Sequence, residues 1–145
     1  MSSRTEKWDR RFLALAEFVA QWSKDPSTKT GAVIVDPNNR VVSVGYNGFP
    51  RGINDLPERL ENRDLKYKLI VHCERNALIF ARGSVERCSL YTWPFMSCAP
   101  CAVMMIQAGI IEAIAPFSDN PRWIEDFKLT QTLFEEAGVK LKLFA

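Results

Sequence analysis

The sequence predicts an α/β protein, built as a three-layer α/β/α sandwich around a mixed sheet of about five strands. Two β-branched runs separated by turn residues predict a hairpin over 31–35 and 41–45. Apolar residues at helical spacing precede this hairpin, and short helical and strand patterns alternate after it. This order is expected for a sheet that is covered by helices on both faces.

The first predicted helix covers 6–22, where apolar residues recur three and four positions apart and would face a core. Its apolar stripe consists of Trp8, Phe12, Leu15, Val19 and Trp22. A polar loop over 23–30 then leads into the hairpin, whose turn is rich in Asp, Pro and Asn. The stretch that follows the hairpin, up to Lys68, is long for a loop in so small a domain, and its length indicates a function.

The second half of the chain alternates between helical and strand patterns. The predicted helices cover 72–82, 99–108 and 121–137, and the predicted strands cover 88–92, 110–115 and 139–144. Pro121 suits a helix start, and Gly109 and Gly138 follow the last two helices, where glycine commonly ends a helix. No repeat, low-complexity tract or linker interrupts these elements, so we expect a single domain over 1–145.

The composition argues against several classes of function. Hydrophobic residues make up 47% and charged residues 25% of the 145 positions, as is usual for a globular protein. A net charge of +2 gives little support for a nucleic-acid groove or an anionic membrane surface. No apolar stretch approaches the ~20 residues of a membrane span, and the N-terminus lacks a signal peptide's apolar segment. We expect a cytoplasmic protein whose four cysteines serve metal binding or catalysis.

Two short motifs carry the chemistry. The only histidine, His72, stands two residues before Glu74, and Cys98 and Cys101 follow as a C-x-x-C pair. One imidazole and two thiolates are three good zinc ligands, and they leave a fourth position for water. Glu74 is the kind of carboxylate that an open hydrolytic site needs as a proton carrier. The motifs therefore predict a catalytic Zn²⁺.

The helix positions of these residues support one shared site. Cys98 and Cys101 are three residues apart at a predicted helix start, so both thiolates can face one point, and the positive helix end favours them. His72 begins another predicted helix, so two helix starts could converge on the metal. A structural zinc stays open as an alternative, because Cys73 or Cys88 could supply a fourth ligand.

Five stretches of the chain resemble a known family. They are 72–78, 98–102, 106–110, 23–35 and 45–50. The order H-x-E…C-x-x-C in the first two is the signature of zinc-dependent deaminases, and these stretches are similar to the cytidine/deoxycytidylate deaminase superfamily. The last two resemble its deoxycytidylate (dCMP) deaminase branch in particular. Ser97 and Cys73 depart from the usual proline and the commoner alanine, but neither change removes a predicted ligand or the carboxylate.

The resemblance implies a hydrolase that deaminates the small nucleotide dCMP to dUMP with release of ammonia. It implies that Glu74 moves the protons, that Asn47 hydrogen-bonds the sugar or base, and that Ala32 packs against the pyrimidine. By position and chemistry, the candidates for the phosphate are Ser23, Lys24 and Arg51. Trp93 and Phe95 could form walls of the base pocket. The family is typically homo-oligomeric, and some members bind dCTP or dTTP as regulators.

Other functions stay open at this point. Deamination of dCTP, a modified dCMP or another cytosine or adenine substrate would need only small changes in the pocket. A tRNA or polynucleotide deaminase should display a basic, aromatic-lined channel, of which this near-neutral chain offers little sign. A non-catalytic zinc module or nucleotide sensor would have no need of Glu74.

Overall fold

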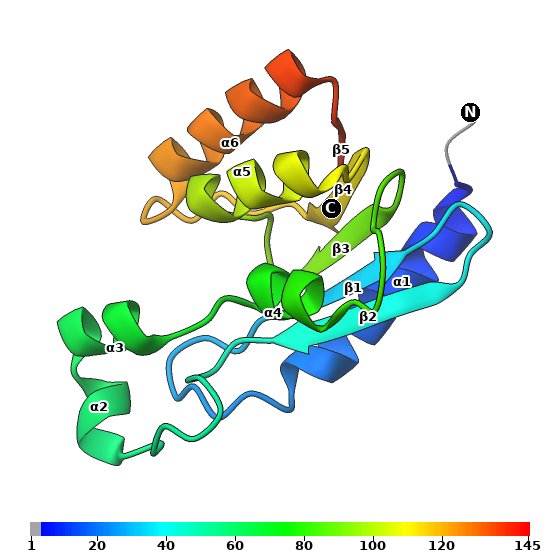
Figure 1. Ribbon diagram of the computed structural model, residues 1–145. Coiled ribbons are helices and arrows are strands. Elements are labelled where there is room, and N and C mark those ends of the chain that lie inside the picture. Colours follow the sequence, from blue (N-terminus) through cyan, green and yellow to red (C-terminus); the bar gives the residue numbers. More distant parts are fainter. Residues whose placement is uncertain (1–3) are drawn as a thin grey trace.

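A five-stranded sheet forms the middle layer of the computed structural model, which describes residues 4–145 (Figure 1). The strands are β1 (Gly31–Val35), β2 (Val41–Tyr46), β3 (Ser89–Trp93), β4 (Glu112–Pro116) and β5 (Lys140–Phe144). Their order across the sheet is β2-β1-β3-β4-β5. β1 runs antiparallel to β2 and β3, whereas β3, β4 and β5 are parallel. This mixed sheet confirms the predicted fold class.

Helices cover both faces of the sheet. The helices are α1 (Glu6–Ala20), α2 (Pro57–Glu61), α3 (Arg63–Leu69), α4 (Cys73–Phe80), α5 (Ala99–Ala108) and α6 (Ile124–Ala137). Alternate residues of a strand point to opposite faces. On one face Val33 and Tyr91 pack against α1, and on the other Ile34 and Leu90 pack among residues of α4, α5 and α6. Figure 1 accordingly shows α1 and α4 on opposite sides of β1 and β2.

The structure differs from the sequence prediction mainly between the hairpin and α4. This stretch contains α2 and α3, which lie apart from the sheet (Figure 1). Pro57 stands in the first turn of α2, and the Asn62 side chain accepts from the N–H of Leu65 to begin α3. Both helices are short and largely exposed, so no long apolar periodicity reveals them.

Helix ends also differ by a few residues. α1 ends at Ala20, and His72 is the N-cap of α4 and not its first helical residue. Pro121 lies in a turn, and α6 begins only at Ile124. Gly109 and Gly138 end α5 and α6 with φ values of 94° and 76°, as expected of glycine at this position. No helix within residues 4–145 is long and apolar enough to cross a bilayer.

Gly45 lets α4 lie directly on β2. A Cβ atom at this position would come within 2.4 Å of the Ala77 nitrogen and 2.5 Å of the Cys73 oxygen. Both are backbone atoms of the helix, so neither can rotate out of the way. The position of α4 relative to the sheet therefore depends on the absence of a side chain at Gly45.

Gly45→Ala is expected to lower the free energy of unfolding by about 3 kcal/mol, the upper end of the usual overpacking cost, because backbone must move to make room. Urea denaturation measures the change. Gly83→Ala is the matched control, since a Cβ there meets nothing within 4 Å. Equal midpoints for the two variants would show that α4 does not approach β2 this closely.

Candidate active site

The predicted zinc ligands meet at the starts of two helices. His72 and Cys98 are the N-cap residues of α4 and α5, both with extended backbone, and Cys101 lies in the first turn of α5. The Nδ1 atom of His72 lies 3.4 Å from Cys98 Sγ and 3.2 Å from Cys101 Sγ. All three ligand atoms lie within 4.8 Å of one another. The chain therefore brings three metal-binding atoms to one point.

The spacing of these atoms fits a tetrahedral zinc ion. Zinc–sulfur bonds of about 2.3 Å and zinc–nitrogen bonds of about 2.1 Å separate nitrogen from sulfur by about 3.6 Å at the tetrahedral angle. The separations in the structure are only slightly shorter. Cys101 is fully buried, whereas His72 and Cys98 are half-buried and line a pocket. A metal held by the three residues would thus have its open side toward this pocket.

The electrostatics of the group favour a thiolate. A hydrogen bond from Cys101 lowers the pKa of Cys98 to about 5. The same contact raises the pKa of Cys101, and the hydrogen bond with Cys98 raises the pKa of His72. The helix start adds a positive partial charge beside the sulfur atoms. Cys98 is therefore stabilised in the form that binds metals.

Glu74 faces the same pocket as the ligands. Because His72 is an extended N-cap residue, it and Glu74 both line the pocket although they are only two residues apart. The Glu74 side chain is buried, and its Oε1 atom accepts a hydrogen bond from Cys73 Sγ at 3.2 Å. The Cys73 thiol thus fixes the orientation of the Glu74 carboxylate.

The structure gives no support to a closed site with four protein ligands. Among residues 4–145, the group of close ligand atoms consists of His72, Cys98 and Cys101 alone. Cys73 contacts Glu74 instead, and Cys88 packs in the core under the sheet. The fourth position of a tetrahedral ion would remain available for water or substrate.

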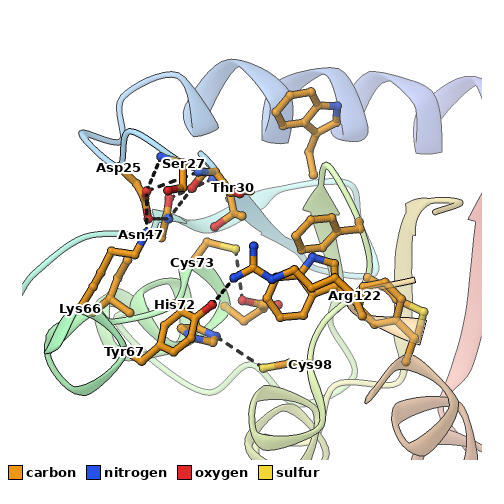
Figure 2. A pocket seen from close by; sticks show the side chains of 18 of the residues that line it. Asp25, Ser27, Thr30, Asn47, Lys66, Tyr67, His72, Cys73, Cys98 and Arg122 are labelled. Carbon is orange, nitrogen blue, oxygen red and sulfur yellow. Dashed lines mark hydrogen bonds and ion pairs between the residues drawn. The ribbon is translucent and has the colours of Figure 1, made fainter. Parts of the chain in front are cut away.

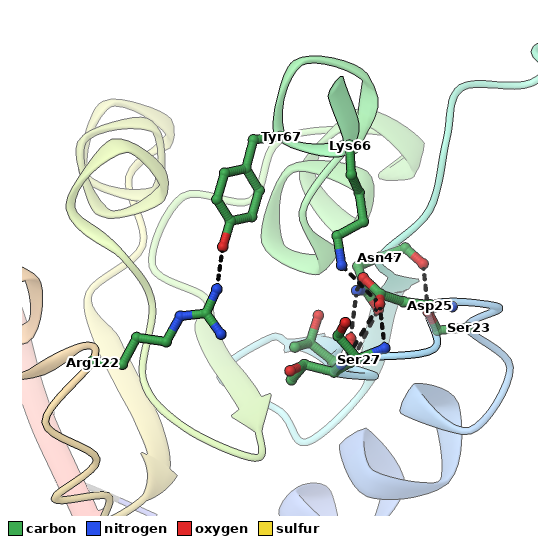
Figure 3. Close-up of polar contacts among 9 residues, drawn as sticks. Ser23, Asp25, Ser27, Asn47, Lys66, Tyr67 and Arg122 are labelled. Carbon is green, nitrogen blue, oxygen red and sulfur yellow. Dashed lines mark hydrogen bonds and ion pairs between the residues drawn. The ribbon is translucent and has the colours of Figure 1, made fainter. Parts of the chain in front are cut away.

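The loop between α1 and β1 forms one wall of the pocket, and the Asn47 side chain holds this loop in place through hydrogen bonds (Figure 2). Its Nδ2 atom donates to Thr28 O at 2.9 Å and to Asp25 Oδ2 at 3.3 Å, and its Oδ1 atom accepts from the N–H of Thr30 at 2.9 Å. Asp25 in turn forms a buried ion pair with Lys66 of α3, at 3.1 Å (Figure 3). Hydrogen bonds and charge therefore fix two distant segments of the chain relative to each other.

Aromatic side chains form the opposite wall. Trp93, at the end of β3, and Phe95 both line the pocket, as the sequence predicts. The Phe95 ring packs against the rings of Trp123 and Phe127, with centroids 6.0 Å and 5.7 Å away. This wall offers apolar surface suited to a planar base.

Four predicted substrate-binding residues are not among those that line the pocket. Ala32 is fully buried in the core, paired with residues of β2 and β3. The buried Ser23 hydroxyl donates to Asn47 O at 2.9 Å, and exposed Lys24 pairs with Asp55. Arg51 lies over the ring of Phe80, outside the pocket. Ala32 contributes to core packing and Ser23 to the structure of the loop. Lys24 and Arg51 lie on the surface.

Sequence reasoning missed several residues that line the pocket. They are Asp25, Ser27, Thr28, Thr30, Arg63, Lys66, Tyr67, Ile70, Met96, Arg122, Trp123 and Phe127. Those of α3 were missed because this stretch has no helical apolar pattern. The charge of Arg122 and the ring of Trp123 carry no local sign of a site, because only the fold brings them to the zinc ligands.

Comparison with known proteins identifies the family. The model of the cytidine and deoxycytidylate deaminase zinc-binding region matches residues 6–116. The chain is 42% identical to mouse deoxycytidylate deaminase and 40% identical to the human one, over 95% of this chain and 80% of each relative. It is 41% identical to an uncharacterized deaminase in the luxG 3′ region of Aliivibrio fischeri, over 93% of this chain and 92% of the relative.

Solved structures support the fold. The dCMP deaminase of the cyanophage S-TIM5 superposes with TM-scores of 0.77 in its apo form and 0.79 in its complex with dCMP and dUMP. At 20% and 21% identity, these matches cover 97% and 98% of this chain and all of the phage chains. The match of the family model over most of the sequence shows that this chain belongs to the cytidine and deoxycytidylate deaminase family.

Proposed function

We propose that this protein is a zinc-dependent dCMP deaminase, which converts dCMP and water into dUMP and ammonia. The observation that carries the proposal is the convergence of His72, Cys98 and Cys101 on one point, with buried Glu74 facing the same pocket. Deoxycytidylate deaminases at about 40% identity over most of the chain support this substrate. One domain spanning 1–145 would carry the whole reaction, in a cytoplasmic homo-oligomer of the kind that the family resemblance implies.

His72 Nδ1, Cys98 Sγ and Cys101 Sγ are the proposed ligands of Zn²⁺. When bound, zinc supplies Lewis-acid activation of water at neutral pH. Glu74 accepts the proton of that water and passes it to ring N3 as water adds to C4. Glu74 then takes the proton of the hydroxyl group now on C4 and delivers it to the amino group, which leaves as ammonia while C4 becomes a carbonyl. The burial of Glu74 and its hydrogen bond from Cys73 hold the carboxylate in one orientation for these transfers.

The pocket walls suit the rest of the substrate. Trp93 and Phe95 provide apolar surface against the pyrimidine, and Asn47 holds the polar loop on the other side. The side-chain nitrogen and oxygen of Asn47 both form hydrogen bonds within this loop. Asn47 therefore positions the wall, in addition to the contact with the sugar or base that the family resemblance implies. We infer that this loop contacts the sugar.

Ammonia release from a panel of substrates tests the proposal. The panel comprises cytosine, deoxycytidine, dCMP, dCTP and cytidine monophosphate, with zinc quantified in the same sample. We expect about one zinc per chain and the highest kcat/KM for dCMP. A preference for dCTP would assign the enzyme to a different substrate. Full zinc occupancy without turnover of any compound would instead support a non-catalytic zinc module.

A further inference from the structure

We propose that Asp126 and Thr130 of α6 are positioning residues of the metal site, an inference that rests on the zinc site of the proposed function. Asp126 Oδ2 accepts a hydrogen bond from the N–H of Ala99 at 3.0 Å. The Thr130 hydroxyl donates to Ser97 O at 2.9 Å. Ser97 and Ala99 are the chain neighbours of Cys98. α6 therefore holds the backbone on both sides of this proposed zinc ligand.

The two side chains lie on the face of α6 that packs against α5 (Figure 1). Asp126 and Thr130 are four residues apart, and residues at this spacing are neighbours on a helix surface. Phe134, one turn further along, belongs to the same core cluster as Ala102 and Met105 of α5. The polar contacts therefore continue an apolar helix–helix packing, so the groups that hold the ligand segment are themselves fixed by the core.

Thr130 directs its hydroxyl out of its own helix. A threonine inside a helix can donate to the carbonyl four residues earlier, as Thr132 does to Lys128 O at 3.1 Å. Thr130 is fully buried, and its hydroxyl instead reaches Ser97 O in the segment before α5. Because burial of a hydroxyl is unfavourable without a hydrogen bond, this contact fixes both the Thr130 side chain and the Ser97 carbonyl.

The start of α5 needs a partner from outside the helix. The first N–H groups of a helix have no acceptor within it, and the side chain of the N-cap residue usually accepts from one of them. Here the N-cap is Cys98, whose side chain faces His72 and does not cap the helix. Asp126 accepts from the Ala99 N–H in its place, and a carboxylate is favoured at a helix start. The Cys98 thiolate is thereby left to the metal.

Ser97 gives the contact with Thr130 more weight. The family resemblance has proline at this position, and a proline ring would fix the φ angle of the residue before Cys98. Serine lacks the ring, so its backbone is freer unless another group restrains it. The hydrogen bond from Thr130 holds the peptide group that joins Ser97 to Cys98. α6 (Ile124–Ala137) lies outside residues 6–116, which match the family model, so this restraint is an addition to the zinc-binding region.

Zinc affinity, measured by competition with a chelator in the full-length protein, tests the proposal. Asp126→Ala should weaken zinc binding by ~10–100-fold, the typical effect of removing a group that orients a metal ligand. Thr130→Val keeps the shape of the side chain and removes one neutral hydrogen bond, so it should weaken zinc binding by roughly 3–10-fold. Glu125→Ala and Thr132→Val are the matched controls, because both residues are exposed on α6 and should leave the affinity unchanged.

Asp126→Asn separates position from charge. The asparagine amide oxygen can still accept from the Ala99 N–H, so this variant should recover most of the zinc affinity that Asp126→Ala loses. The visible absorption of the Co²⁺-loaded protein gives a second readout, because it depends on the geometry of the ligands around the metal. The spectrum should change in Asp126→Ala and stay as in the wild type in Thr132→Val. A general loss of stability would lower the melting temperature without this change in the spectrum.

The proposal is overturned if Asp126→Ala or Thr130→Val binds zinc as tightly as the wild type, or if the exposed controls lose as much affinity. It is also overturned if Asp126→Asn binds zinc as weakly as Asp126→Ala. If Asp126→Ala does not fold, the affinity of Thr130→Val decides. A wild type that binds zinc but deaminates no cytosine compound would refute the proposed function alone, since the affinities still measure the role of α6. A wild type that binds no zinc would overturn both.

Discussion

Glu74→Gln is expected to keep its zinc and to lose ~10²–10⁴-fold in kcat for dCMP, the usual contribution of a general acid–base group. Glutamine has nearly the same shape, and its amide oxygen can still accept from the Cys73 thiol. It cannot accept or deliver a proton, so every transfer between water, N3 and the amino group would lose its carrier. Steady-state kinetics and zinc analysis of the same sample measure the two properties together.

Glu58→Gln provides the matched control for this change. Glu58 is an exposed carboxylate on α2 that does not line the pocket, so its amide variant should turn over dCMP as the wild type does. A Glu74→Gln enzyme with nearly wild-type kcat would rule out the proton-carrier role. Loss of zinc from that variant would mean that Glu74 supports the metal site and not only the chemistry.

Cys101→Ala is expected to abolish stoichiometric zinc binding and, with it, detectable deamination. Removal of a group that merely orients a ligand typically costs 10–100-fold in metal affinity, so loss of a ligand should cost more than about 100-fold. Cys101 is fully buried at the start of α5, and its loss leaves only His72 and Cys98 of the group of close ligand atoms among the described residues. Zinc content after dialysis and the melting temperature with and without a chelator measure the effect.

Cys88→Ala separates the loss of a ligand from the loss of a buried sulfur atom. Cys88 is also a buried cysteine, but it packs in the core among residues of α5 and α6. This variant should keep one zinc per chain. The chelator should lower the melting temperature of the wild type and of Cys88→Ala, because the metal stabilises the folded state to which it binds. Zinc loss from Cys88→Ala would instead support the alternative of a structural zinc with four protein ligands, one of them Cys88.

The convergence of His72, Cys98 and Cys101 was predictable from sequence because its information is local. The ligand types, the C-x-x-C spacing and the N-cap positions of His72 and Cys98 are all properties of short segments. The end of α5 was predictable for the same reason, since Gly109 marks it. A short motif can therefore identify a metal site before the fold is known.

Most of the other residues that line the pocket, beyond Asn47, Trp93 and Phe95, were not predictable in this way. The pair of Asp25 and Lys66 joins residues 41 positions apart, and Tyr67 meets Arg122 across 55 positions. No local pattern distinguishes these charges from those of a solvated loop. Arg51 illustrates the difficulty, because its chemistry suits a phosphate although the fold turns it toward Phe80 on the surface. Only the tertiary arrangement decides which cation faces the substrate.

The separation of α2 and α3 from the sheet has a consequence for the dynamics of the enzyme. Neither helix comes close to another helix or strand, apart from each other. α3 is held to the loop before β1 by the buried ion pair of Lys66 with Asp25, so α2 is the segment expected to open locally at a fraction of the global unfolding free energy. α4, by contrast, packs with its backbone directly against β2 at Gly45. Residues 57–61 should therefore exchange their amide hydrogens faster than those of α4, while the buried charge pair keeps α3 beside the pocket.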